Sequence, residues 1–172
     1  KNKDAVLSST PPDALAANQL TLRAARPEDL NRIIELLPQL ADFDIPEQRQ
    51  PQQLWQGDAA LATAILTGEN EQSFIHLAVT EDDQIGGFVI ITLRPEMLSE
   101  APSAHLETII VGPQFRGIGL GRRLLQHTES EVRARGAGSL TLHVFRRNER
   151  AHSLYQSFVF DDEMIRAIKW LD

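Results

Sequence analysis

The stretch Val111-Gly112-Pro113-Gln114-Phe115-Arg116-Gly117-Ile118-Gly119-Leu120-Gly121 connects the end of an apolar segment to the start of an amphipathic one. Its three alternate glycines lie where the expected helix begins. The first turn of a helix has backbone N–H groups without partners and the positive end of the helix dipole. Glycine has no Cβ atom, so an anion can come close to those N–H groups. The stretch therefore predicts a phosphate-binding loop between a strand and a helix.

Two common phosphate loops do not fit this stretch. The dinucleotide pattern G-x-G-x-x-G requires a glycine at position 122, which is Arg122. The P-loop pattern requires Gly-Lys-Ser or Gly-Lys-Thr, which is absent. The remaining pattern is Gln/Arg-x-x-Gly-x-Gly over Gln114–Gly119, with Gly121 behind it.

A second informative stretch runs from Asn148 to Phe160 and reads Asn-Glu-Arg-Ala-His-Ser-Leu-Tyr-Gln-Ser-Phe-Val-Phe. Asn148 is a good N-cap residue. Four apolar or aromatic side chains follow at helical spacing and form one face of a short helix, namely Ala151, Leu154, Tyr155 and Phe158.

Together the two stretches resemble the signature motifs of the GCN5-related N-acetyltransferases, the GNAT superfamily. The first resembles the loop that holds the pyrophosphate of acetyl-coenzyme A, and the second resembles the motif N-x-x-A-x-x-L-Y-x-x-x-G-F. One position departs from the second motif, because Val159 replaces the usual glycine before the final phenylalanine. This leaves open whether the turn after the helix is the usual one.

Length and composition indicate one domain and exclude some chemistry. The 172 residues are 42% apolar, which is enough for one continuous core. No run of about 18 apolar residues and no signal-peptide pattern occurs, so we expect a cytoplasmic protein that does not enter a membrane. The chain contains no cysteine, which excludes disulfides, thiolate metal ligands and a cysteine nucleophile.

The net charge of −7 bears on the partners. Acidic clusters at residues 81–83 and 161–163 disfavour nucleic acid and modestly favour cationic substrates. No spacing of His, Asp and Glu indicates a metal site, so we predict none. No Ser-His-acid arrangement is recognisable either.

The order of predicted elements is β-α-α-β-β-β-α-β-α-β. Residues 1–19 predict a mobile leader and residues 20–172 the domain. Strands are expected at 20–25, 73–80, 84–93, 105–111, 139–145 and 164–171, with a bulge or close backbone approach at Gly86-Gly87. Helices are expected from residue 26 with Ile33, Ile34, Leu37 and Leu40 as its buried stripe, at 52–66, at 120–135 and around Tyr155.

The resemblance implies a fold of the α/β (α+β) class. A single GNAT-type domain would have a mixed, mostly antiparallel central sheet of about six or seven strands, with helices on both faces. The adjacent parallel strands, here His105–Val111 and Ser139–Phe145, would splay apart. The region from 41 to 68 would border the acceptor site.

The resemblance also implies acetyl-coenzyme A as cosubstrate. The backbone amides of the glycine loop would hold its pyrophosphate, with Arg122 near phosphate and Arg123 in solvent. The strand edge would pair with the pantetheine arm, and Asn148 would lie near that arm. The implied loop residues are Arg116, Gly117, Ile118, Gly119, Leu120, Gly121 and Arg122, and the implied edge residues are Ile109, Ile110 and Val111.

Acetyl transfer needs a proton donor for the departing thiolate and an acceptor for the amine proton. By resemblance Tyr155 is the leading acid, and the alternative is a packed aromatic whose hydroxyl bonds a neighbour. Three side chains are candidates for the base, in the order Glu107, His105 and His143, and ordered water is a fourth route. Two of them, His105 and Glu107, lie two apart on one strand, so a regular strand places both on the face of Ile109 and Val111.

The most favoured function is N-acetylation of a primary amine of a small molecule. Two alternatives stay open: acetylation of a peptide or protein, at its N-terminus or at a lysine, and a non-catalytic acyl-coenzyme A sensor. An acid at the sulfur favours an enzyme, because a pure binder does not need one. Family habit implies a homodimer and leaves the oligomeric state undecided.

Overall fold

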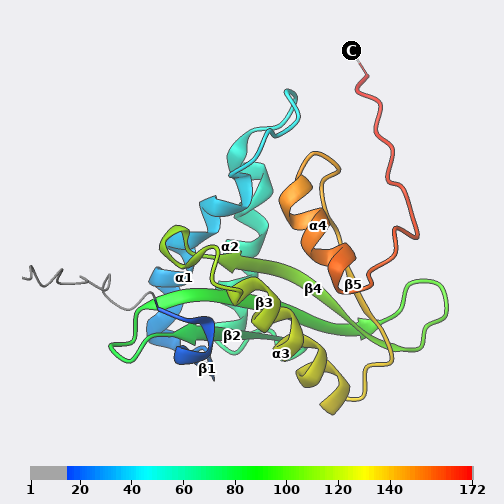
Figure 1. Cartoon of the computed structure of the whole chain (residues 1–172). Helices are drawn as coiled ribbons and strands as arrows, with labels where there is room; N and C mark the ends of the chain where they lie inside the picture. The colour runs from blue at the N-terminus through cyan, green and yellow to red at the C-terminus, as the bar shows by residue number, and fades with distance from the viewer. Residues whose placement is uncertain (1–14, 172) are drawn as a thin grey trace, which may run out of the picture.

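A computed structural model describes residues 15–171 of the chain. Its centre is a five-stranded sheet in the order β1-β2-β3-β4-β5 (Figure 1). The strands β1 (Thr21–Ala24), β2 (Ser73–Val79), β3 (Ile85–Pro95) and β4 (Pro102–Val111) are antiparallel neighbours. Only β5 (Leu140–Leu142) runs parallel to its neighbour, β4. The predicted mixed, mostly antiparallel sheet is confirmed.

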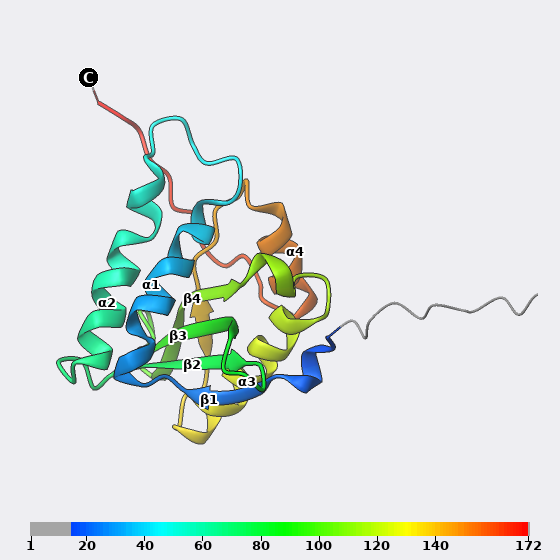
Figure 2. The same cartoon turned by 90° about the vertical axis from the view of Figure 1, so that its left-hand side faces the viewer.

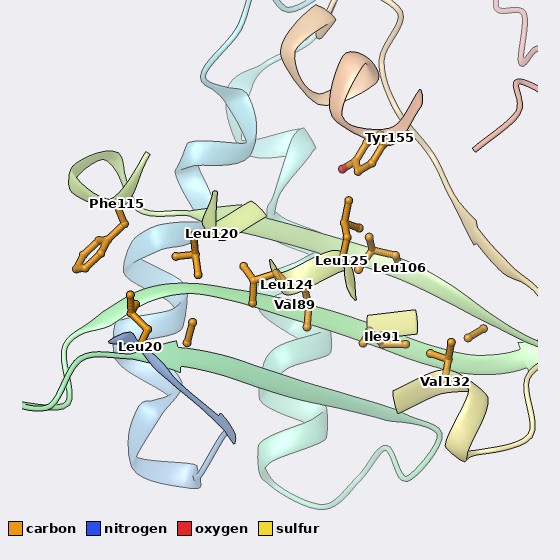
Figure 3. Packing of buried hydrophobic residues seen from close by; sticks show 12 residues of the cluster. Leu20, Val89, Ile91, Leu106, Phe115, Leu120, Leu124, Leu125, Val132 and Tyr155 are labelled. Carbon is orange, nitrogen blue, oxygen red and sulfur yellow. The ribbon is translucent and has the colours of Figure 1, made fainter. Parts of the chain in front are cut away.

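Helices cover both faces of this sheet (Figure 2). The helices α1 (Leu30–Leu36) and α2 (Gln56–Leu66) pack on one face, where Ile33, Leu37 and Ala62 are buried against the strands. The helices α3 (Leu120–Ala134) and α4 (Glu149–Ser157) pack on the other face. Figure 3 shows that second core, in which Leu124 and Leu125 of α3 lie over Val89 and Leu106 of the sheet.

Short 3-10 turns connect these elements. They are η1 (Ala17–Gln19), η2 (Pro27–Asp29), η3 (Leu37–Ala41), η4 (Pro51–Leu54) and η5 (Pro113–Phe115). The predicted helix over 52–66 is therefore interrupted, and its first part is η4. Within residues 15–171, no helix has the length and apolar character that a membrane span requires. The predicted leader falls mostly outside the described residues, which begin at Leu15.

The strand predicted at 164–171 is wrong, which explains why the described sheet has five strands and not six or seven. Residues 161–171 have no regular structure and are exposed, because no neighbouring strand supplies a hydrogen-bond ladder for them. The Trp170 ring instead lies under the guanidinium of Arg49, 4.9 Å from its centroid. The predicted strand 139–145 is likewise reduced to β5.

The glycine pair in β3 forms the predicted bulge. Ala78 pairs with Gly87 and Val79 pairs with Ile85, so Gly86 is the extra residue. A Cβ atom on Gly87 would lie 2.6 Å from the carbonyl oxygen of Ile110. Both predicted features, the bulge and the close backbone approach, are confirmed.

A second bulge, in β4, was not predicted. Ile90 pairs with Thr108 and Ile91 pairs with Leu106, so Glu107 has no partner and is the extra residue. An extra residue reverses the alternation of side chains along a strand. The core of α3 and α4 accordingly receives Ala104, Leu106, Ile109 and Val111, whereas Ile110 faces α1 and α2.

Candidate active site

The glycine loop has the backbone that the sequence predicts. Gly117 and Gly119 have φ values of 78° and 83°, in the left-handed region that favours glycine. A Cβ atom at either position would meet nothing within 4 Å, so the loop faces open space. Gly119 is the N-cap of α3 and makes no side-chain capping bond. The N–H groups of the first turn are therefore available to an anion.

The parallel strands separate beside this loop, as predicted. The pairing of β4 with β5 covers Ala104, His105 and Leu106 and ends there. From Glu107 to Val111, β4 continues without a ladder on its β5 side. This edge leaves main-chain groups free for an extended ligand, in the manner of an added strand.

A cavity of about 520 Å³ joins the glycine loop to the open edge of β4. Figure 1 shows α4 beside β4, over the part of the sheet where the cavity lies. Most predicted site residues line this cavity. Of the predicted residues, the lining includes Glu107, Ile109, Ile110, Val111, Arg116, Gly117, Gly119, Leu120, Gly121, Arg122, His143, Asn148 and Tyr155, and excludes Ile118 and His105.

The residues present fit acetyl-coenzyme A. A pyrophosphate needs backbone N–H donors and positive charge, and the first turn of α3 has no acidic residue while Arg122 and Arg150 line the cavity. A pantetheine arm needs an unpaired strand edge, which β4 provides. Asn148 both lines the cavity and caps α4, since its Oδ1 accepts from the Ala151 N–H at 3.3 Å.

The only tyrosine of the chain, Tyr155, lies in the last turn of α4. Tyr155 is 8% exposed, lines the cavity and packs against the ring of Phe160, 5.9 Å between centroids. In Figure 3 its side chain extends from α4 toward the sheet, above Leu125. Burial raises the pKa of Tyr155 to about 12. The hydroxyl therefore keeps its proton at neutral pH and can serve as a donor.

The structure contradicts the prediction that His105 lies on the strand face of Ile109 and Val111. The bulge at Glu107 reverses the alternation along β4, so Ile109 and Val111 lie on the face of Leu106. His105 is 3% exposed and outside the cavity lining. Its Nδ1 lies 2.7 Å from Oγ1 of Thr141. Burial lowers the pKa of His105 to about 4, and the charges of Arg94 and His143 add to this. His105 is therefore a neutral core histidine at physiological pH.

The other two candidate bases line the cavity. Glu107 is 25% exposed at its side chain, and its Oε2 lies 3.9 Å from Nε2 of His105. The ring of His143 is 4.7 Å from that of His105 and lies just after the last residue of β5. Of the three side chains predicted as candidate bases, Glu107 and His143 therefore line the cavity and His105 does not.

Sequence reasoning missed Asp58, which lines the cavity from α2. Its Oδ1 accepts a 2.6 Å hydrogen bond from the Thr108 hydroxyl on β4. Burial raises the pKa of Asp58, and the charge of Glu107 adds to the rise. An acid in the first turn of a helix is commonly a dipole partner, so the sequence carried no signal for this contact.

The arginines of the loop have specific partners. Arg116 donates to Asp42 at 2.9 Å and to Gln39 at 3.0 Å, which connects the glycine loop to η3 and the residue after it. Arg122 donates to the Ser157 hydroxyl at 3.1 Å. The prediction that Arg123 is solvated is wrong, because Arg123 donates to the backbone carbonyls of Ala17 and Leu20.

The turn after α4 keeps a left-handed residue although glycine is absent. Val159 has φ 64° and is 84% exposed. The backbone therefore takes the conformation that a glycine would take. Because Val159 is β-branched, this left-handed conformation strains it.

The fold and this cavity define a class of protein in which a helix start and a splayed strand edge together bind a long anionic cosubstrate. Comparison with known proteins identifies the family within that class. The model of the acetyltransferase (GNAT) family matches residues 30–160. The chain belongs to this family.

Relatives by sequence match the chain over part of its length. The ribosomal protein bS18-alanine N-acetyltransferase of Salmonella typhimurium is 36% identical over 99 residues, which are 58% of this chain and 63% of that protein. The streptothricin acetyltransferase of Streptomyces lavendulae is 33% identical over 93 residues, 54% of this chain and 47% of that protein. The chain thus spans less than two thirds of the length of these relatives.

Solved structures match almost the whole fold. A ribosomal-protein-alanine N-acetyltransferase from Brucella melitensis biovar Abortus superposes with a TM-score of 0.66 at 18% identity, covering 88% of this chain and 99% of that one. An aminoglycoside acetyltransferase from an uncultured soil sample gives 0.62 at 18% identity, covering 90% and 98%. At this identity the likeness concerns the fold alone.

Proposed function

We propose that the protein transfers the acetyl group of acetyl-coenzyme A to a primary amine of a small molecule in the cytoplasm. One observation carries the proposal: a single cavity contains the glycine loop, the free edge of β4, Tyr155 and the carboxylates of Glu107 and Asp58. Donor and acceptor sites therefore meet where a proton donor is present. A cationic amine is the acceptor that these carboxylates favour.

The chemistry follows from the groups that line this cavity. The neutral amine attacks the thioester carbonyl carbon, a C–N bond forms, and the C–S bond breaks. Tyr155 donates its proton to the sulfur as negative charge develops there. The proton of the amine passes to Glu107 or His143, directly or through water, and the base then returns a proton through solvent to the tyrosinate of Tyr155. The products are the amide and the free thiol of coenzyme A.

A second candidate acceptor is the N-terminal alanine of a peptide. It is favoured by the relative from Salmonella typhimurium, whose name states that it acetylates an alanine of ribosomal protein bS18. The same cavity would then receive the peptide amine between α2 and β4. The two candidates share the donor site and differ only in the acceptor.

The test is a turnover assay on the full chain. Thiol release and product mass are measured with acetyl-coenzyme A against a diamine, an amino sugar, an amino acid and a peptide with N-terminal alanine. Acetylation of a small amine supports the proposal, whereas acetylation of the peptide alone supports the second candidate. Calorimetric binding of acetyl-coenzyme A without any turnover would support the sensor and contradict both.

A further inference from the structure

A cluster of three side chains lies between the sheet and α3, away from the cavity. His76 belongs to β2, and His127 and Glu131 belong to α3. The two helix residues are four positions apart, so they share one face of α3. None of the three lines the cavity of the proposed active site. The cluster is therefore a separate feature of the fold.

The potential ligand atoms of the cluster face one another. Nδ1 of His76 lies 2.6 Å from Nε2 of His127. One ligand atom from each of the three residues lies within 4.8 Å of the other two. In the described part of the chain, the contact between the two rings is the only hydrogen bond that either side chain makes. The pair thus has no other polar partner that explains why the rings converge.

Imidazole nitrogen is a common ligand of transition metals. A metal ion would replace the proton that the two ring nitrogens share in their hydrogen bond.

The surroundings hold the carboxylate in place. Oε2 of Glu131 accepts from the guanidinium of Arg135, one turn further along α3. That guanidinium lies over the ring of Phe74, 3.9 Å from its centroid, and the rings of Phe74 and His76 form a T-shaped pair with centroids 5.1 Å apart. A hydrogen-bonded carboxylate beside a metal is a common supporting arrangement, and the second oxygen of Glu131 stays available.

We propose that His76, His127 and Glu131 bind one Zn²⁺ ion, with water as the fourth ligand. Two imidazoles and one carboxylate are donors that Zn²⁺ accepts, whereas Ca²⁺ and Mg²⁺ prefer oxygen alone. Tetrahedral Zn²⁺ would place the two nitrogens about 3.4 Å apart, so the rings must separate by less than about 1 Å. The ion would connect β2 to α3, the helix that begins at the glycine loop.

The proposal differs from the prediction of no metal site that the sequence spacing gave. The spacing of His127 and Glu131 was the only local sign of a metal site. Two polar residues at i and i+4 of a helix usually lie together on its solvent-exposed face. The third residue lies 51 positions earlier in the chain, on a strand. Only the packing of α3 on the sheet brings it to the other two.

The test uses the full chain without an affinity tag, after treatment with a chelator. Zn²⁺ affinity is measured by competition with a chromophoric chelator, and the visible absorption of bound Co²⁺ reports the coordination. We expect one ion per chain. His76→Phe, His127→Gln and Glu131→Gln should each weaken Zn²⁺ binding about tenfold or more. The matched control is His152→Gln, which removes a histidine that pairs with Asp162 outside the cluster.

Three results would overturn the proposal: wild-type protein that binds no Zn²⁺ in competition with the chelator, cluster variants that bind like the wild type, or a control that loses the ion equally. Circular dichroism checks that each variant is folded. If His76→Phe does not fold, the two helix variants decide, because Glu131→Gln leaves the histidine pair intact. Acetyl-coenzyme A binding is measured in parallel, so a failure of the donor site is recognised separately.

Discussion

The two walls of the cavity differ in the groups that they offer to the proposed ligands. The donor wall consists of the edge of β4 and the start of α3, and it offers mainly backbone groups. The acceptor wall consists of α2 and the segment around residues 39–43, and it offers side chains such as Asp58 and Asp42. A backbone site tolerates many side chains provided that its glycines remain. A side-chain site can change its substrate by a single substitution.

Tyr155 lines the same cavity from α4, and its removal should have the largest effect on activity. Tyr155→Phe should lower kcat about 10²-fold or more, because the sulfur loses its proton donor. The affinity for acetyl-coenzyme A should not change, because the donor wall is intact. Turnover is followed by thiol release and binding by calorimetry. A variant with wild-type kcat would show that Tyr155 is only a packed aromatic.

Outside the cavity, a buried carboxylate just before α1 should have the largest effect on stability. Asp29 is fully buried and accepts from Arg23 at 2.7 Å and from Arg32. Asp29→Ala leaves Arg23 without its main partner and should lower the free energy of unfolding by about 3 kcal/mol. The matched control is Asp83→Asn, whose half-exposed carboxylate pairs with the same arginines and should cost under about 1 kcal/mol.

The pH dependence of stability has a definite sign at this site. The hydrogen bond from Arg23 holds the pKa of Asp29 far below its usual range. The unfolded chain takes up this proton near the ordinary pKa of about 4, whereas the folded chain does not. The contribution is therefore complete above about pH 5 and decreases as the pH falls. Urea unfolding at several acidic pH values should show a shallower acid dependence in Asp29→Ala than in the wild type.

The acceptor wall is tested by Asp58→Asn. The change keeps the shape of the side chain and removes the charge that would attract a cationic amine. KM for such an amine should rise about tenfold, which corresponds to about 1.4 kcal/mol, while the Kd of acetyl-coenzyme A stays the same. Asp44→Asn serves as control, because Asp44 is 85% exposed at its side chain and pairs with Arg147. An equal rise of KM in both variants would indicate that the overall negative charge attracts the amine and that Asp58 makes no specific contact with it.

The smallest expected effect concerns the turn after α4. Val159 carries the strain of a left-handed β-branched residue, so Val159→Gly should raise the free energy of unfolding by about 1 kcal/mol. Val159→Ala keeps the left-handed strain and should bring a smaller gain. Thermal unfolding of the three proteins measures the order. A loss of stability in Val159→Gly would contradict this, because it would mean that contacts of the valine side chain stabilise the fold by more than the backbone strain destabilises it.

The donor wall could be predicted from the sequence because local rules determine it. Alternate glycines are needed where φ is positive, and the helix and strands around them follow from periodicity. The acceptor wall could not be predicted, since Asp58 acquires its role through contact with Thr108, fifty residues away. The exclusion of His105 from the predicted strand face depends on a bulge at Glu107 that no local residue pattern signals. The prediction of a strand at 164–171 was wrong because this apolar segment has no partner strand in the described fold.

The central claim is that backbone amides at the start of α3 hold the donor, and the two glycines at the ends of this helix test it. Gly119 and Gly136 flank this helix, both have positive φ, and a Cβ atom on either meets nothing within 4 Å. Alanine should therefore strain both positions similarly, by about 1–2 kcal/mol.

The measurement is a calorimetric titration of the wild type, Gly119→Ala and Gly136→Ala with acetyl-coenzyme A. We expect Gly119→Ala to raise Kd about tenfold or more, because its Cβ atom enters the anion site, and Gly136→Ala to bind like the wild type. Wild-type affinity in Gly119→Ala, or an equal loss in both variants, would contradict the assignment of the donor site.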